Sequence, residues 1–315
     1  MLFEVNSTKM ERPAYAAVFR LGNGLRKTLY ALGAILFALS LAYIVNFTAR
    51  NWHAVGELSQ ISALPLIVAV VTYGATHVSG SAAWILGLRQ MGQDIPLRAG
   101  MPINFVTQIG KYLPGNVAHY VARAGLASAS GVKLRSSGTA TLLEVLATLV
   151  AAMVVASLAM LFDPAPAKAL DQALSGSIAL PLILAFAGIA TAVAFLALAK
   201  VPARAFIVTA ACVVMNFIFI GLSFFALVSG MSATALSPIA AIGIFAVAWT
   251  AGYVVPGAPA GLGVREAILV SWVGPIIGSG PAITCVILHR VISACVDALV
   301  AFLGYAWLRM EKAAR

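Results

Sequence analysis

The chain has 315 residues, of which 62% are hydrophobic and only 10% charged, and its formal net charge is +10. Its mean hydropathy is +0.99 and its pI is about 9.9. A soluble domain carries about 25% charged residues, and intrinsic disorder requires low hydrophobicity. The composition excludes both classes and predicts an integral membrane protein. We expect no nucleic-acid partner despite the basic pI, because Lys and Arg gathered on one side of a bilayer account for the charge.

Six apolar runs follow a polar N-terminal segment at 1–27. Each run is long enough to cross a hydrocarbon core of about 30 Å as a helix that rises 1.5 Å per residue. The runs lie at 28–47, 61–86, 138–162, 178–199, 205–229 and 283–308. A linker at 163–177 divides the transmembrane part into 28–162 and 178–308, and a short tail follows at 309–315.

Two further apolar regions, 99–127 and 238–276, are interrupted. Lys111-Tyr112-Leu113-Pro114-Gly115-Asn116 divides the first, and a stretch rich in proline and glycine at 256–263 divides the second. Proline and glycine at this density end a helix, and the pieces on either side are short for independent spans. We interpret each region as a re-entrant hairpin or a pair of broken helices, whose loop must be buried in protein or line a cavity.

The distribution of basic residues predicts the orientation of the chain. With a cytoplasmic N-terminus, and with both interrupted regions returning to the side they enter from, fourteen of the twenty Lys and Arg residues lie on the cytoplasmic side. Two lie on the other side, and four fall at membrane depth. This asymmetry predicts that the N- and C-termini are both cytoplasmic.

The two interrupted regions resemble one another. In each, a Pro-Gly pair is followed by an arginine nine residues after the proline, and the copies, Pro114 with Arg123 and Pro256 with Arg265, are 142 positions apart. The same offset brings the apolar run at 61–86 onto the run at 205–229. The matched order of long apolar runs and interrupted regions predicts a duplication. If each copy crosses the membrane three times, the second copy has the inverted topology. The expected fold is an all-α integral membrane protein with two inverted repeats, each of three spanning helices and one broken or re-entrant helical hairpin.

Ionisable side chains at membrane depth cost roughly 2.5–3.5 kcal/mol each and therefore mark candidate functional residues. Four basic and three acidic residues lie there, which leaves one positive charge and predicts an anionic ligand. Each Pro-Gly pair also begins a half-helix, whose free N–H groups favour a phosphate. The predicted substrate-binding residues are Lys111, Pro114, Gly115, Asn116, His119, Arg123, Pro256, Gly257, Gly261, Gly263, Arg265 and Glu266.

A second group at this depth is predicted to form ion pairs or to take part in coupling. This group consists of Glu144, His289, Arg290 and Asp297. One alternative for the first interrupted region is a buried pair between Arg123 and Glu144 that only holds helices together. A similar pair would join Arg290 to Glu266 or Asp297. The matched positions of the two arginines behind the Pro-Gly pairs favour a binding role for them instead.

The histidines and cysteines show no metal-ligand spacing. The three cysteines fall inside apolar runs, where they are interpreted as small buried side chains. His77 lies among small polar residues, which indicates a helix-packing role. We therefore expect neither a metal nor a cofactor.

The second interrupted region contains Pro256-Gly257-Ala258-Pro259-Ala260-Gly261-Leu262-Gly263-Val264-Arg265-Glu266, which resembles the PGGLGVRE signature of the lysylphosphatidylglycerol synthase transmembrane family. The stretch Gly110-Lys111-Tyr112-Leu113-Pro114-Gly115-Asn116, followed by Arg123, is similar to the first motif of that family. The family comprises flippase-like membrane domains, which are fused to a soluble synthase domain or stand alone. The resemblance implies a stand-alone flippase-like protein of the prokaryotic cytoplasmic (inner) membrane, and not a synthase.

Three functions compete. The first is a flippase-like transporter of an anionic lipid, either a phospholipid or a polyprenyl-phosphate-linked sugar, with Arg123 and Arg265 holding the phosphate from opposite sides of a basic cavity. The second is an integral-membrane enzyme that acts on lipid phosphates, similar to a polyprenyl-phosphate phosphatase. No serine nucleophile follows the Pro-Gly pairs, and Glu144 and Glu266 are single acids, so we expect no enzyme. The third is a scaffold partner for a separate lipid-modifying enzyme.

Overall fold

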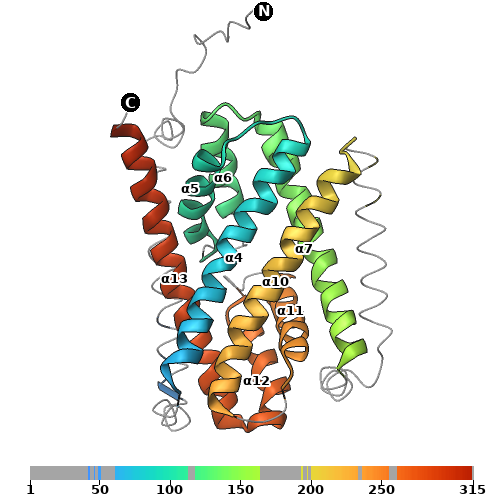
Figure 1. Cartoon of the computed structure of the whole chain (residues 1–315), viewed down its shortest axis with the longest axis vertical. Coiled ribbons are helices and arrows are strands. Elements are labelled where there is room, and N and C mark those ends of the chain that lie inside the picture. Colours follow the sequence, from blue (N-terminus) through green and yellow to red (C-terminus); the bar gives the residue numbers. More distant parts are fainter. Residues whose placement is uncertain are drawn as a thin grey trace, which may run out of the picture.

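The computed structural model describes residues 61–112, 118–163, 201–232, 236–254 and 261–313, with a few single positions at 42–50 and 193–200. Within this part every element is a helix (Figure 1). The elements in chain order are α4 (Ala63–Gln90), α5 (Leu97–Thr107), the 3-10 helix η3 (Gln108–Tyr112), α6 (Ala118–Ala129), α7 (Leu134–Phe162), α10 (Ala203–Met231), α11 (Pro238–Val254), α12 (Val264–Ile277) and α13 (Ser279–Ala313).

Four of these helices, α4, α7, α10 and α13, are long and apolar enough to cross a membrane. They coincide with the predicted runs at 61–86, 138–162, 205–229 and 283–308. The other two predicted runs, at 28–47 and 178–199, fall almost entirely outside the described residues, and the predicted boundaries of the two repeats stay predictions. Four helices of this length and hydropathy make the chain a membrane protein.

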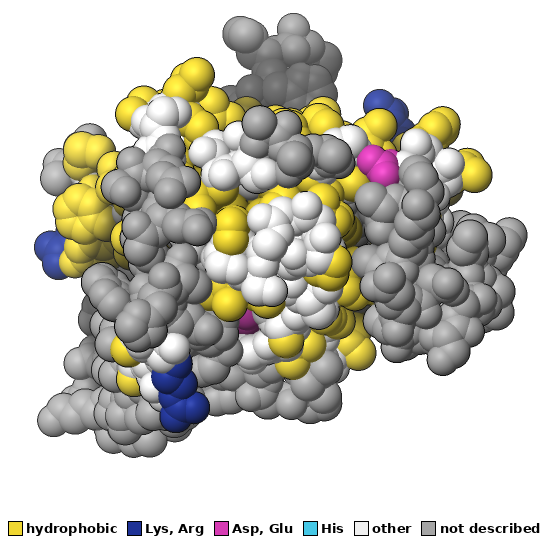
Figure 2. All heavy atoms as spheres, turned by 90° about the horizontal axis from the view of Figure 1, so that it is seen from below, with side chains coloured by type: hydrophobic (Ala, Val, Ile, Leu, Met, Phe, Trp, Pro, Cys, Tyr) yellow, Lys and Arg dark blue, Asp and Glu magenta, His cyan; other side chains and the backbone are white. Residues whose placement is uncertain are grey.

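The outer surface of the bundle suits a lipid environment. Leu64, Ile67 and Val71 on α4 are each more than half exposed, and such exposed apolar side chains are stable where the solvent is hydrocarbon. Seen from below, hydrophobic side chains predominate over charged ones in the described part of the surface (Figure 2).

Both interrupted regions are broken in the structure as predicted. The first forms α5, η3 and α6, and the second forms α11 and α12. In Figure 1, α4 ends and α7 begins at the upper end of the bundle, where α5 and α6 lie, whereas α10 ends and α13 begins at the lower end, beside α11 and α12. Each interrupted region therefore begins and ends at the same end of the bundle: the first at the upper end, between α4 and α7, and the second at the lower end, between α10 and α13. The Pro-Gly pairs and Asn116, at 114–116 and 256–257, lie outside the described residues.

Within each interrupted region, a glycine before the break packs closely against the backbone after the break, and the two contacts lie at matching sequence positions. A Cβ atom on Gly110 would lie 2.8 Å from the backbone nitrogen of His119, and a Cβ atom on Gly252 would lie 2.9 Å from the Cα atom of Gly261. Gly252 is 142 residues after Gly110, and Gly261 is 142 residues after His119. The long helices show nearly the same offset, since α10 begins 140 residues after α4. Helix α10 runs in the opposite direction to α4 in Figure 1.

The substitution Gly252→Ala is expected to lower the free energy of unfolding by about 1–3 kcal/mol, because the added methyl group would overpack the α11–α12 contact. Gly74→Ala on α4 is the matched control, since a Cβ atom there meets nothing within 4 Å, and alanine is favoured over glycine in a helix by roughly 0.5–1 kcal/mol. Thermal unfolding in detergent measures both. Equal stability of the two variants would contradict the close contact.

Candidate functional site

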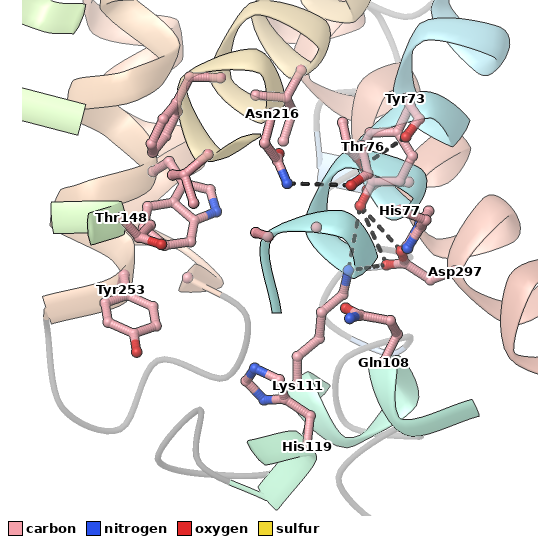
Figure 3. Close-up of a pocket in the computed structure, with 18 of the residues that line it drawn as sticks. Tyr73, Thr76, His77, Gln108, Lys111, His119, Thr148, Asn216, Tyr253 and Asp297 are labelled. Atoms are coloured by element: carbon pink, nitrogen blue, oxygen red, sulfur yellow. Dashed lines mark hydrogen bonds and ion pairs between the residues drawn. The ribbon is translucent and has the colours of Figure 1, made fainter. Parts of the chain in front are cut away.

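A cavity of about 180 Å³ lies among α4, η3, α6, α7, α10, α11, α12 and α13. A single water needs only about 10–15 Å³, so the space is large enough for a polar ligand group. Sites between the helices of a bundle are a common place for ligands. Helices from both halves of the chain line it, which makes this cavity the candidate functional site (Figure 3).

The carboxylate of Asp297 on α13 is the centre of a polar network at this cavity. It is fully buried, and it lies 2.8 Å from the Lys111 ammonium and 3.0 Å from Nε2 of His77. The hydroxyls of Tyr112 and Tyr73 donate to it over 2.6 and 3.2 Å. The network joins α13 to α4 and η3, and Figure 3 shows Lys111 pointing toward Asp297. Lys111 thus balances the charge of Asp297 at the cavity wall.

A second charged group contains two arginines and one acid. Nη2 of Arg265 and Nε of Arg290 lie 3.5 and 3.6 Å from the same oxygen, Oε1 of Glu266. The other oxygen of Glu266 accepts a hydrogen bond of 2.7 Å from the backbone N–H of Gly263, at the start of α12. Charge-assisted hydrogen bonds are ordinarily 2.7–2.9 Å, so both guanidinium contacts are long. Arg265 and Arg290 line the cavity and bring one positive charge in excess of Glu266.

Arg123 has a different environment from Arg265. Its two terminal nitrogens contact the two oxygens of Glu144, and Nη1 also donates to Oδ1 of Asn104 over 2.9 Å. Its guanidinium lies 5.0 Å from the centre of the Trp84 ring. Arg123 is fully buried and does not line the cavity, whereas Glu144 does. This is the buried ion pair that the sequence offered as an alternative, and the structure does not place the two arginines on opposite sides of one cavity.

The remaining predicted residues are divided between the cavity and its surroundings. His119 lines the cavity, with its ring 3.8 Å from that of Tyr120. Gly261 also lines it and adopts a positive φ of 72°. His289 is buried and packs by its ring against Tyr73, Phe224 and Phe245. Within the described residues, no three His, Cys, Asp or Glu side chains are grouped as metal ligands.

A comparison with protein families matches residues 30–301 to the model of the lysylphosphatidylglycerol synthase TM region. The chain belongs to this family. The match includes both interrupted regions and most of each of the four long described helices, and it confirms the resemblance seen in the sequence motifs. Membership in the family is consistent with a membrane protein of lipid-related function. A comparison with curated proteins gave no match.

Several cavity residues of this family member were not predicted from its sequence. The sequence indicates a packing role for His77, yet His77 contacts Asp297. The predicted site does not include Tyr73, which belongs to the same network. Tyr73, Thr76 and His77 are spaced by three and four residues, which places them on one face of a helix. A polar face on an otherwise apolar span is the signal that would have identified them. The aromatic residues Trp249 and Tyr253, which also line the cavity, carry no such signal because aromatic residues are common in apolar helices.

Because Arg123 contacts both Glu144 and Asn104 through its planar fork, Arg123→Lys is expected to cost about 1–3 kcal/mol of stability. The positive charge is kept and the cavity lining is unchanged, so the rise in thermal stability on adding phosphatidylglycerol should stay at the wild-type value. Arg98→Lys at an exposed position of α5 is the control. A smaller effect of phosphatidylglycerol, with no loss of thermal stability in its absence, would show that Arg123 acts on the ligand and not on the fold.

Proposed function

We propose that this protein is a flippase-like transporter of the prokaryotic cytoplasmic membrane that moves an anionic lipid. Its N- and C-termini would face the cytoplasm. One observation carries the proposal: Arg265 and Arg290 share a single carboxylate oxygen at the wall of a cavity. An additional anion, such as a lipid phosphate, would balance the remaining charge and offer the Arg265 guanidinium a shorter hydrogen bond than its 3.5 Å contact with Glu266.

The arrangement of the two halves supports an inverted repeat around this cavity. Helices α4 and α10 run in opposite directions, and the two interrupted regions lie at opposite ends of the bundle (Figure 1). The close glycine contacts within these regions also lie at matching sequence positions, 142 residues apart. We infer that the regions are re-entrant hairpins that enter the membrane from opposite sides, as in secondary transporters, whose substrate sites lie near the midplane between repeats.

We infer transport and not bond cleavage. General acid–base chemistry by a carboxylate on a phosphate ester needs a carboxylate that is free to exchange a proton with the reacting group. Each of the three carboxylates of the site is held by a basic partner: Asp297 by Lys111, Glu144 by Arg123, and Glu266 by two arginines. Such pairing suits the balancing of charge in a nonpolar environment.

Reconstitution into liposomes tests the proposed function. The vesicles contain a trace of phosphatidylglycerol or phosphatidylcholine with a fluorescent NBD group on one acyl chain, and dithionite bleaches only the label in the outer leaflet. We expect the protein to make the inner-leaflet phosphatidylglycerol accessible faster than phosphatidylcholine. Folded protein that leaves phosphatidylglycerol at the rate of protein-free vesicles would refute the proposal.

A further inference from the structure

Helix α6 is held in place by few residues. Two of its twelve residues, Arg123 and Ala127, are buried, and Val121 on its outer face is 66% exposed. The helix packs on α5, η3 and α7, which all belong to the first half of the chain. His119 and Tyr120 at its beginning nevertheless line the cavity, and Figure 3 shows His119 pointing toward it. One wall of the candidate site therefore belongs to a weakly anchored helix.

The corresponding helix of the second half, α12, is anchored more firmly. Its residues Leu269 and Trp272 are buried in the apolar core. The residues 142 positions earlier are Ala127 and Ser130, which have far less apolar area to bury. The two copies have thus diverged in the side chains that fix this helix to the core, and the difference leaves α6 as the more easily displaced of the two.

A single hydrogen bond joins described residues of α6 to described residues of the second half. The hydroxyl of Tyr253, at the end of α11, donates to the hydroxyl of Tyr120 over 3.5 Å. Hydrogen bonds between hydroxyl groups are ordinarily 2.5–3.0 Å long, so this one is weak. The ring of Tyr253 stacks on that of Trp249 at 4.9 Å, which fixes it to α11. Moving α6 away from α11 therefore breaks one weak hydrogen bond at the cavity wall.

Arg123 supplies a pivot for such a movement. Its guanidinium contacts Glu144 on α7 and Asn104 on α5, and charge-assisted hydrogen bonds are stronger than those between neutral groups. Arg123 lies one helical turn after Tyr120, so these contacts can hold α6 while its first turn moves. The first turn packs closely on Gly110, which has no side chain to interlock with it.

From these observations we propose that α6 is the movable wall of the cavity. Helix α6 turns about the contacts of Arg123, Tyr120 separates from Tyr253, and the gap between the two tyrosines is the entrance for a head group. The role as an entrance rests on the proposed function, whereas the movement itself does not. The inference adds an asymmetry to the repeat: α6 moves, and α12 stays in the core.

Distances between pairs of spin labels test the movement. The labels are attached to introduced cysteines in a variant whose three native cysteines are replaced by alanine, and the protein is placed in nanodiscs. One pair joins Ser128 on α6 to Met215 on α10, and the matched pair joins Ser271 on α12 to Met215. All three positions are exposed. Electron–electron double resonance should give two distances for the α6 pair and one for the α12 pair.

The variant Tyr253→Phe removes the hydrogen bond to Tyr120 and keeps the ring. It should raise the ratio of the longer to the shorter α6 distance by about two- to threefold, because a hydrogen bond this long is at the weak end of its range. Tyr120→Phe should have the same effect, and the double variant no more than either, since all three lose the same bond. Tyr305→Phe, whose hydroxyl accepts from Arg309 on the outside of α13, is the matched control and should leave the ratio unchanged.

A covalent link between the two tyrosine positions tests the entrance. Tyr120→Cys and Tyr253→Cys are combined in the cysteine-free protein and joined by a bismaleimide long enough to replace the two rings. The thioether link survives the dithionite of the liposome assay. We expect the linked protein to leave phosphatidylglycerol at the rate of protein-free vesicles. Each single-cysteine variant, treated with the same reagent, should still translocate the lipid.

Two results would overturn the inference while the proposed function stands. The first is a single α6 distance, unaltered by Tyr253→Phe, in protein that translocates phosphatidylglycerol. The second is translocation by the linked protein at the rate of the single-cysteine variants. Two α6 distances in protein that moves no lipid would refute transport and keep the movable wall.

Discussion

Replacing Arg265 by glutamine is expected to reduce the translocation of phosphatidylglycerol by about 10- to 150-fold, which corresponds to the loss of one hydrogen bond to a charged group, worth about 1.5–3 kcal/mol. Arg265 lines the cavity and shares its acidic partner with Arg290. Glutamine removes the positive charge and leaves Glu266 to Arg290 alone. The site then has no charge in excess for a phosphate. Because Glu266 keeps one guanidinium and its backbone contact to Gly263, the fold should hold.

Two further variants make this result interpretable. Arg265→Lys restores the charge without the bidentate geometry of arginine, so its rate should lie between those of the wild type and of Arg265→Gln. Arg98→Gln removes a positive charge at an exposed position and should leave the rate unchanged. A folded Arg265→Gln protein that translocates phosphatidylglycerol at the wild-type rate would show that the phosphate does not bind there.

The variant Asp297→Asn is expected to destabilise the lipid-free protein by about 3 kcal/mol, the lower end of the range for breaking a buried ion pair. The lower end applies because the side chain of Lys111 is 23% exposed and lines the cavity. Asparagine has nearly the size of aspartate and can still accept from Tyr112. It leaves Lys111 without a negative partner, however, so an anionic lipid should now stabilise the protein more than it stabilises the wild type.

Thermal unfolding in detergent, with and without added phosphatidylglycerol, measures both effects. Asp94→Asn is the matched control, because that carboxylate is 96% exposed and lies 3.9 Å from Arg89, and such surface pairs are worth about 0–1 kcal/mol. If the lipid stabilises Asp297→Asn no more than the wild type, Lys111 does not reach the bound head group, and its role is limited to the Asp297 network.

The sequence predicts the architecture better than it predicts the pairing of side chains. Run length and hydropathy locate α4, α7, α10 and α13, because a span of about 20 apolar residues is a local property. The Pro-Gly pairs locate the two breaks for the same reason. The partners of Asp297 are a different case: Tyr112 is 185 residues away and Tyr73 is 224 residues away. Contacts over such distances depend on how the helices pack, which no local pattern contains.

The two repeated arginines show how a duplication can mislead. Arg123 and Arg265 occupy matching positions, and the sequence alone suggests matching roles. Their partners have diverged, because Val286 stands 142 residues after Glu144 and offers no carboxylate to Arg265. Arg123 is therefore held by Glu144, while Arg265 shares Glu266 with Arg290. The partner of each repeated arginine, and not the arginine alone, distinguishes the structural arginine from the candidate binding residue.

The central claim is that the cavity beside Arg265 holds the phosphate of an anionic lipid. A single-particle structure of the protein in nanodiscs that contain phosphatidylglycerol tests it most directly. We predict density for a phosphate within hydrogen-bonding distance of the Arg265 guanidinium, with the acyl chains leading from the cavity to the bilayer. A cavity filled only by water, in protein that translocates phosphatidylglycerol in liposomes, would contradict the claim.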